Sequence, residues 1–277
     1  MDRILMRDLF WQLITDEEYQ TLKELIESAI GINLNFKRRD FIENLLIKRF
    51  KELDISDFKS YYKFIKNNEQ EMTCLINLVT NISTDFFREK HHFEYMSNHI
   101  LPMLMASKRK IRLWSAGCST GEEPYSIAMT VFETIGNIYE YDIKILATDI
   151  NTNALEMARE GIYNQSYAEK LSDHVKSFHV IEDNNIKKIQ INNVVREIIA
   201  FRKLNLLESW PMKNLFDVIF CRNVTIYLKP EVTNQLFRHF DKLLEPGGFL
   251  VLGHSESLNL FSSRYICLGK TMYKKVR

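Results

Sequence analysis

Hydrophobic residues change their spacing partway along this chain of 277 residues. Over the N-terminal third, apolar positions recur every three or four residues, which is typical of one face of a helix. Leu22 and Ile26 follow this spacing, and Gly31 is placed to end their helix. The same spacing predicts a second helix over about 37–53 and a third from Phe58 to Ile65.

From Ile111 onward, short apolar runs alternate with helical segments, which favours strands joined by helices. Strands are expected at 111–115, 143–148, 197–202, 216–221 and 248–253, with a last antiparallel pair near 264–275. Helices are expected at about 122–135, 152–160 and 230–244. Pro246-Gly247-Gly248 predicts a turn, because glycine readily adopts positive φ. The alternation predicts an α/β fold with a doubly wound sheet.

One polar segment interrupts this alternation at about 163–200, and it predicts an insertion with a small β excursion. We therefore expect two domains. The first covers 1–100 and is helical, with a linker helix at its end. The second covers 101–277 and contains the sheet and the insertion.

Composition narrows the classes of function. The 37 Lys and Arg residues nearly balance the 36 Asp and Glu residues, which argues against a general nucleic-acid binder. The longest apolar runs are only as long as a strand, and charges interrupt the N-terminal ones, so neither membrane insertion nor a secretory signal is expected. The four cysteines form no C-x-x-C pair, so we expect a reduced, cytoplasmic protein without a zinc site.

The most informative motif is a glycine-bearing loop between a strand and a helix. Gly117 and Gly121 lie in this loop, and the next strand ends in Asp149. Doubly wound sheets build nucleoside sites in this way: the backbone approaches the ligand at the glycines, and the acid binds the ribose hydroxyls. The G-x-G-x-x-G spacing is incomplete, so a dinucleotide is not favoured. A single adenosine-type cofactor such as S-adenosylmethionine fits better.

Five segments, in this order, carry a resemblance to a known family. They are Thr80–Glu89 (TNISTDFFRE), Trp114–Ser126 (WSAGCSTGEEPYS), Ala147–Ile150, Phe216–Tyr227 and Gly253–Ser257 (GHSES). On these residues the chain resembles the bacterial chemotaxis receptor methyltransferases almost from end to end. The resemblance implies a Rossmann-like class I methyltransferase sheet with a small β insertion, preceded by an all-helical domain that recognises the receptor.

The same resemblance implies a reaction, in which the methyl group of S-adenosylmethionine is transferred to receptor glutamates to give 5-O-methyl esters in sensory adaptation. A glutamate with an ordinary pKa near 4.3 is ionised at neutral pH, so no general base is needed. The sulfonium is a good leaving group, and the enzyme mainly has to align the reacting atoms. We therefore expect neither a catalytic triad nor a metal.

Several site residues follow from the resemblance, and each has a simpler alternative. Asp149 is expected to bind the ribose, although it also precedes a helix and could cap it. Glu122 is expected to contact the cofactor's ammonium group, although an acid at a helix start also offsets the helix dipole. Thr84 and Arg88 are expected near the cofactor and the reacting groups, and a salt bridge between domains is the alternative for Arg88.

Further residues match cofactor-contacting positions at the ends of two other strands: Asn205, Leu206, Arg222 and Asn223. Tyr227 is expected to form a wall of the active site, although a core tyrosine is an equal alternative. Ile82 stands where the family often has a polar or small residue, and Asn81 is the residue that would have to compensate. His91 and His92 are interpreted as ordinary helix residues.

The helix expected at 37–53 carries a basic flank that the resemblance makes a candidate docking face for an acidic receptor bundle: Lys37, Arg38, Arg39, Lys48 and Arg49. A solvated surface is the alternative, and Arg49, counted at 100° per residue, falls within the apolar sector. Asn44 stands where the family pattern has an arginine. The insertion lacks the glycine-containing loop expected of members that bind a receptor's C-terminal peptide, so tether binding is not expected. A monomer is expected.

Three rival functions remain at this stage. Gly117-Cys-Ser-Thr-Gly121 fits the G-x-S-x-G pattern, and Ser119, Asp217 and His254 occur in the chain order of a serine hydrolase. Against this reading, Asp217 begins a strand instead of following one. The second rival is a non-catalytic scaffold that binds S-adenosylmethionine. The third is a methyltransferase of another acceptor.

Overall fold

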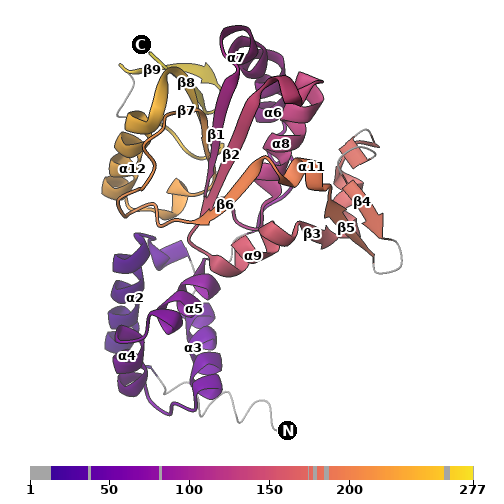
Figure 1. Ribbon diagram of the computed structural model, residues 1–277. Helices are drawn as coiled ribbons and strands as arrows, with labels where there is room; N and C mark the ends of the chain where they lie inside the picture. Colours follow the sequence, from indigo (N-terminus) through magenta and orange to yellow (C-terminus); the bar gives the residue numbers. More distant parts are fainter. Residues whose placement is uncertain are drawn as a thin grey trace. The chain divides into compact units, whose positions relative to one another are not determined.

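The computed structural model describes residues 14–36, 39–80, 83–173, 175–176, 180–183, 187–258 and 263–276 (Figure 1). The chain divides into two compact units, and the first contains the residues up to Thr80 together with Tyr227–Lys229. The second contains the rest of the chain from residue 81 onward. Among the described residues, none of the helices combines the length and the apolar character that a membrane crossing requires.

The first unit is helical, as expected. Its elements are α2 (Asp16–Ile30), η1 (Leu34–Phe36), α3 (Arg39–Leu53), α4 (Phe58–Lys66) and α5 (Glu69–Val79). The predicted spacing buries Leu22 and Ile26 of α2 completely. Thr15 begins this helix with a capping box to Glu18, and Gly31 ends it in the left-handed region at φ 66°.

A buried ion pair joins α3 to α5. Arg49 Nε donates to Glu71 Oε1 at 3.0 Å, and Tyr61 Oη donates to the same oxygen at 2.8 Å. The arginine therefore lies within the apolar sector, as its position on the helix predicted. Because Glu71 is buried, its charge depends on Arg49 for compensation.

A short segment from late in the chain also belongs to the first unit. Leu228 forms an isolated antiparallel bridge with Ile32, and the carbonyl of Tyr227 accepts from the backbone N–H of Asn33 at 2.6 Å. Lys229 Nζ lies 3.0 Å from Glu27 Oε2. The 3-10 turn η5 (Thr225–Tyr227) leads into this segment.

The second unit is built on a seven-stranded sheet with the order β6-β2-β1-β7-β8-β10-β9. Its strands are β1 (Lys110–Ala116), β2 (Asp142–Asp149), β6 (Ile199–Lys203), β7 (Phe216–Cys221), β8 (Leu244–Leu252), β9 (Tyr265–Gly269) and β10 (Met272–Lys275). In this order, all neighbouring strands from β6 through β2, β1 and β7 to β8 are parallel, whereas β10 is antiparallel to β8 and to β9. The predicted doubly wound sheet and its antiparallel end are confirmed.

Helices cover both faces of this sheet (Figure 1). They are α6 (His91–Tyr95), η2 (Met96–Ile100), α7 (Leu101–Ser107), α8 (Glu122–Ile135), η3 (Ile138–Glu140), α9 (Thr152–Glu160), α11 (Asn193–Arg196) and α12 (Pro230–Leu243). Successive side chains of a strand point to opposite faces. Accordingly Ser115 of β1 hydrogen-bonds to Glu123 of α8, while the Trp114 ring lies 5.2 Å from the Phe240 ring of α12.

The stretch of sequence that follows the helical bundle and precedes the first strand of the main sheet belongs to the second unit. The sequence predicts a domain boundary near residue 100, with a linker helix at the end of the N-terminal domain. In the structure the first unit ends at Thr80, and α6, η2 and α7 form one continuous helical stretch over 91–107 that contacts α8. Buried Phe93, Met96 and Ile100 belong to the same core as the sheet.

The inserted segment forms a separate antiparallel sheet with the order β3-β5-β4. Its elements are β3 (Ile162–Asn164), η4 (Gln165–Lys170), β4 (Val180–Asp183) and β5 (Lys188–Ile191). The expected β excursion is therefore present. Its Tyr163, Ile189 and Ile191 are buried in the same hydrophobic core as the main sheet.

One predicted boundary is wrong. The sequence predicts a turn at Pro246–Gly248, but these residues lie inside β8, which begins at Leu244. Gly247 does adopt the predicted positive φ, at 78°. The pairing of β8 with β7 shifts register between Phe216 and Val218, so the strand absorbs the glycine as an irregularity and does not end there.

Candidate cofactor-binding site

The topology places one candidate site at the carboxyl ends of β1 and β7. From β1 the chain proceeds to β2 and β6 on one side, whereas β7 and β8 lie on the other side. Strand order therefore reverses between β1 and β7. Ligands of open α/β sheets bind in the crevice at such a switch point. The residues that follow β1, β2, β6 and β7 are those that sequence analysis selected.

The glycine loop after β1 is held against β2. The backbone N–H groups of Gly117 and Cys118 donate to the carbonyl of Thr148 at 2.8 and 2.9 Å. Both glycines have positive φ, and a Cβ on Gly117 would lie 2.4 Å from Val224 Cγ2. A Cβ on Gly121 would lie 2.9 Å from Ala158 Cβ. Close packing within the protein thus requires both glycines, independently of the ligand approach predicted from the sequence.

Asp149 ends β2 and connects this loop to the following helix. Its Oδ2 accepts from the N–H of Ser119 at 2.7 Å, and its Oδ1 accepts from the N–H of Asn151 at 2.8 Å. The side chain of Asn151 accepts from the N–H of Ala154 and so caps α9. The helix-capping role that was the alternative for Asp149 therefore belongs to Asn151. Burial raises the pKa of Asp149, against the lowering effect of these hydrogen bonds. The N–H of Ile150 also hydrogen-bonds to this carboxylate, which leaves one of its four acceptor positions for a further donor.

Glu122 is the first residue of α8 and is almost completely buried. Thr120 Oγ1 donates to its Oε2 at 2.6 Å, and burial raises the pKa of Glu122. An acid at this position also interacts favourably with the helix dipole. Its side chain retains acceptor capacity for a cationic or hydroxyl donor.

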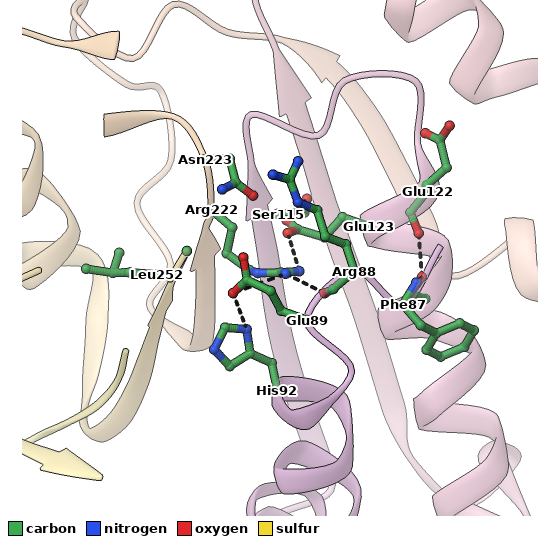
Figure 2. A network of polar contacts seen from close by, with 12 residues as sticks. Phe87, Arg88, Glu89, His92, Ser115, Glu122, Glu123, Arg222, Asn223 and Leu252 are labelled. Carbon is green, nitrogen blue, oxygen red and sulfur yellow. Dashed lines mark hydrogen bonds and ion pairs between the residues drawn. The ribbon is translucent and has the colours of Figure 1, made fainter. Parts of the chain in front are cut away.

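Arg222 follows β7 directly and is the centre of a buried polar network (Figure 2). Its Nη1 donates to Glu123 Oε2 at 3.2 Å, and its Nη2 donates to the carbonyl oxygen of Arg88. Glu123 also accepts from Ser115 Oγ at 2.7 Å. Burial raises the pKa of Glu123 even though Arg222 opposes this effect. The Nε of Arg222 is a buried donor that has no partner among the described residues.

Glu89 extends this network toward two histidines. Its Oε2 lies 3.6 Å from Arg222 Nη2 and 3.5 Å from His92 Nδ1, and its Oε1 lies 3.0 Å from His254 Nδ1. Figure 2 shows Glu89 between Arg222 and His92. Burial alone would raise the pKa of Glu89, but the His254 hydrogen bond and the Arg222 charge lower it below its ordinary value. This carboxylate is therefore charged at neutral pH.

Glu256 anchors the loop after β7 from the next strand along the sheet. Its carboxylate accepts from the backbone N–H groups of four residues: Asn223, Val224, Thr225 and Gly253. Asn223 is held at φ 58°, a conformation that asparagine tolerates better than most residues. Sequence reasoning did not single out Glu256 or Glu89, although both lie inside the quoted motifs TNISTDFFRE and GHSES.

The other predicted residues lie as follows. Among the described residues, the Arg88 side chain donates only to the carbonyl of Ser83, from Nη1 at 3.3 Å, and Thr84 lies in the same loop. This loop is tied to α8, because the N–H of Phe87 donates to Ser126 Oγ at 2.9 Å. Phe87 and Glu89 both have positive φ, so the loop carries backbone strain on either side of Arg88. Asn81 and Ile82 lie outside the described residues.

Asn205 and Leu206 follow β6, and the N–H of Leu204 joins them to the β2 end by donating to the carbonyl of Asp149 at 3.0 Å. Asn205 Nδ2 donates to Glu208 Oε1 at 3.0 Å. The structure thus brings these residues together with Asp149. Tyr227 is different, because it belongs with Asn33 in the helical unit. Its role as an active-site wall stays a prediction.

The hydrolase triad is not assembled. Asp217 lies at the amino end of β7, where its carboxylate accepts from the N–H of Arg112 at 2.7 Å. Ser119 follows β1 at the opposite edge of the sheet. His254 hydrogen-bonds to Glu89 and not to Asp217. The chain order that suggested this rival therefore does not correspond to a catalytic geometry.

Among solved structures, the N-methyltransferase NodS from Bradyrhizobium japonicum in complex with S-adenosyl-L-homocysteine is 13% identical, with a TM-score of 0.41 over 72% of this chain and 92% of that chain. Sequence comparison is more informative. The all-alpha domain of the CheR methyltransferases matches residues 17–80, and their SAM binding domain matches residues 82–274.

Named relatives agree with both matches. The probable chemotaxis protein methyltransferase of Rhizobium etli is 40% identical over 85% of this chain and 90% of its own length. The chemotaxis protein methyltransferase of Borreliella burgdorferi is 37% identical over 88% of this chain and 89% of its own length. That of Escherichia coli K12 is 34% identical over 94% and 91%. This chain therefore belongs to the CheR family of S-adenosylmethionine-dependent chemotaxis protein methyltransferases.

Proposed function

We propose that this protein transfers the methyl group of S-adenosylmethionine to glutamate side chains of chemotaxis receptors, which gives glutamate 5-O-methyl esters. The observation that carries this proposal is the convergence of Asp149, Glu122 and Arg222 on the switch point of a CheR-type sheet. The relatives named above, all chemotaxis protein methyltransferases, support the choice of receptor proteins as acceptors.

The residues at the switch point fit the cofactor. The open acceptor position of Asp149 suits a ribose hydroxyl, and the buried Glu122 carboxylate suits the ammonium group. The unpaired Nε of Arg222 offers a buried donor to an acceptor of the cofactor or the substrate. We assign Asn205 and Leu206 to the adenine side, and Asn223 and Thr84 to the methionine side.

When bound, S-adenosylmethionine supplies an electrophilic methyl group whose sulfur is a good leaving group. An ionised glutamate needs no base to attack that methyl carbon. The protein's contribution is therefore alignment and exclusion of water. Arg88 is suited to hold the incoming carboxylate, because its guanidinium uses one donor, on Ser83, within the part of the chain that the structure describes. Tyr227 is proposed as a wall of this site.

The proposed receptor contact is helix α3. Lys48 is its most open candidate, since its side chain is 67% exposed and its ion pair with Glu52 is long, at 3.7 Å. Arg39 pairs with Asp16 and Glu43 and is partly exposed. Arg49 is only 14% exposed and is bound to Glu71, so we assign it to the fold and not to docking. Lys37 and Arg38 lie outside the described residues and stay predictions.

We further propose that the protein acts in the cytoplasm, as a monomer, on the helical bundle of the receptor. The near balance of charges favours a protein acceptor over RNA. Binding of a receptor's C-terminal peptide to the inserted sheet is not part of this proposal, in line with the sequence analysis.

The direct test is methyl transfer from S-adenosyl-[methyl-³H]methionine to receptor-containing membranes, followed by counting of the methanol that mild base releases. Base-labile counts on a receptor-sized band would support carboxyl methylation. The variant Asp149→Ala should lose these counts, whereas Asp142→Ala, at the other end of the same strand, should keep them. Normal binding of S-adenosylhomocysteine without any counts would mean that the acceptor is different or that the protein is a scaffold.

A further inference from the structure

Two buried atoms next to Arg222 have unused binding capacity. Glu89 Oε2 and His92 Nδ1 are buried, lie 3.5 Å apart, and have no hydrogen-bond partner in the part of the chain that the structure describes. Potential ligand atoms of Glu89, His91 and His92 all lie within 4.8 Å of one another. Buried polar atoms are nearly always paired. Two such atoms left open side by side therefore point to a missing third group.

The hydrogen bonds of His92 show what kind of group is missing. Its Nε2 lies 2.7 Å from the carbonyl oxygen of Lys270, which can only accept, so Nε2 carries the ring proton. In a neutral imidazole that carries its proton on Nε2, the other ring nitrogen, Nδ1, has a lone pair. Nδ1 is then an acceptor that faces a carboxylate oxygen without a proton between them. A cation bound between them would satisfy both atoms.

We propose that Glu89, His91 and His92 bind a divalent transition-metal ion of the zinc type. Two imidazole nitrogens and one carboxylate oxygen, with water in the fourth position, are a common zinc ligand set. Ligand atoms about 2.1 Å from a tetrahedral ion lie roughly 3.4 Å from one another, close to the 3.5 Å between Glu89 Oε2 and His92 Nδ1. His91 is only partly buried, which gives the ion a route from solvent.

The charge of Arg222 opposes a metal here, because its Nη2 lies 3.6 Å from Glu89 Oε2. This guanidinium is already engaged by Glu123 and by the Arg88 carbonyl, so it does not occupy the lone pairs of that oxygen. Glu89 and Glu123 together offset its charge. An ion at this position would draw Glu89 away from Arg222. Resting on the proposed function, we therefore expect zinc to inhibit methyl transfer.

Metal binding is tested on the full-length protein, without a histidine tag and freed of metals by a chelator. Titration with Co²⁺ should give the visible absorption bands of a four-coordinate site, saturating at one ion per chain, and Zn²⁺ should displace the bands. His91→Gln should weaken binding by about tenfold or more, the scale of losses seen even for residues that only support metal ligands. The matched control is His99→Gln, which alters an exposed histidine on the same helical stretch.

Absence of saturable Co²⁺ bands in the unaltered protein would overturn the site. Equal affinities of His91→Gln and the unaltered protein would overturn it as well. If His91→Gln fails to fold, Glu89→Gln provides the same comparison. None of these measurements uses the cofactor or a receptor. A protein that binds zinc but methylates no receptor would therefore overturn only the proposed function.

Discussion

Arg222 Nη1 and Glu123 Oε2 form a 3.2 Å ion pair in which both side chains are buried. The pair connects the end of β7 to the first turn of α8, the two elements on either side of the switch point. Each partner has a second contact, Glu123 with Ser115 and Arg222 with the carbonyl of Arg88. The pair therefore fixes the position of the Arg88 loop relative to the sheet.

Replacing Arg222 with Ala is expected to lower the free energy of unfolding by about 3–5 kcal/mol, because Glu123 would be left buried without a counter-charge. Chemical denaturation of the protein, followed by the fluorescence of the second unit, should show this loss of stability. Lys90→Ala, which removes an exposed pair with Glu94, is the control and should cost less than about 1 kcal/mol. Similar stabilities of the two variants would contradict the proposed dependence of Glu123 on Arg222.

Asp149→Ala should weaken binding of S-adenosylhomocysteine by about 1–3 kcal/mol, because it removes an acceptor for the ribose hydroxyls. Asp142→Ala is the matched control, since Asp142 begins the same strand and pairs with Arg112 at the opposite edge of the sheet. Isothermal calorimetry at constant pH measures both. Unchanged affinity in Asp149→Ala would remove the ribose assignment.

Cofactor affinity should depend on pH in a direction fixed by Glu122 and Asp149. Burial raises the pKa of both carboxyl groups in the free protein. Ionised carboxylates bind the donors of the cofactor, so protons held by the free protein must be released on binding. Affinity should therefore be constant well above these pKa values and fall as the pH drops through them.

Calorimetry of S-adenosylhomocysteine between about pH 7 and about pH 5 tests this dependence. The variants Glu122→Gln and Asp149→Asn should each bind more weakly at neutral pH and show a shallower decline. A decline as steep in both variants as in the unaltered protein would assign the proton release to other groups.

Much of the secondary structure of the second unit can be predicted from local sequence patterns. The alternation of apolar runs and helical segments located the parallel strands. Asp149 was found because it ends one of these strands, and Arg222 because its segment resembles the family motif. Such features depend on near neighbours in the chain. The turn predicted at Pro246–Gly248 was wrong in its bounds, because β8 already begins at Leu244 and its pairing with β7 resumes at Phe249, beyond these residues.

Contacts between distant segments could not be predicted in the same way. Glu89 and Arg222 are far apart in sequence, and nothing in their local patterns indicates that they meet. The raised pKa of Glu123 likewise depends on burial by the whole fold. The sequence predicts only an ordinary helix residue at His92, because the carbonyl of Lys270 that lies beside its Nε2 comes from a distant part of the chain.

Arg88→Ala should reduce the rate of methyl transfer by roughly 10- to 100-fold, the range for a lost hydrogen bond to a charged group. Binding of S-adenosylhomocysteine should change less, because the contact that holds Arg222 uses the backbone carbonyl of Arg88 and survives the substitution. Single-turnover rates and calorimetry on one preparation separate the two effects. Equal losses in rate and affinity would make Arg88 a cofactor contact.

The basic residues of α3 should separate into two groups. Arg49→Met is expected to destabilise the helical unit by about 3 kcal/mol or more, because Glu71 is buried and would lose its counter-charge. Lys48→Met should leave the free energy of unfolding nearly unchanged, since its side chain is exposed. Receptor methylation at limiting receptor concentration should instead fall in Lys48→Met and recover in Lys48→Arg. A normal methylation rate in Lys48→Met would remove this residue from the proposed receptor contact, and a fully stable Arg49→Met would show that its ion pair with Glu71 does not support the helical unit.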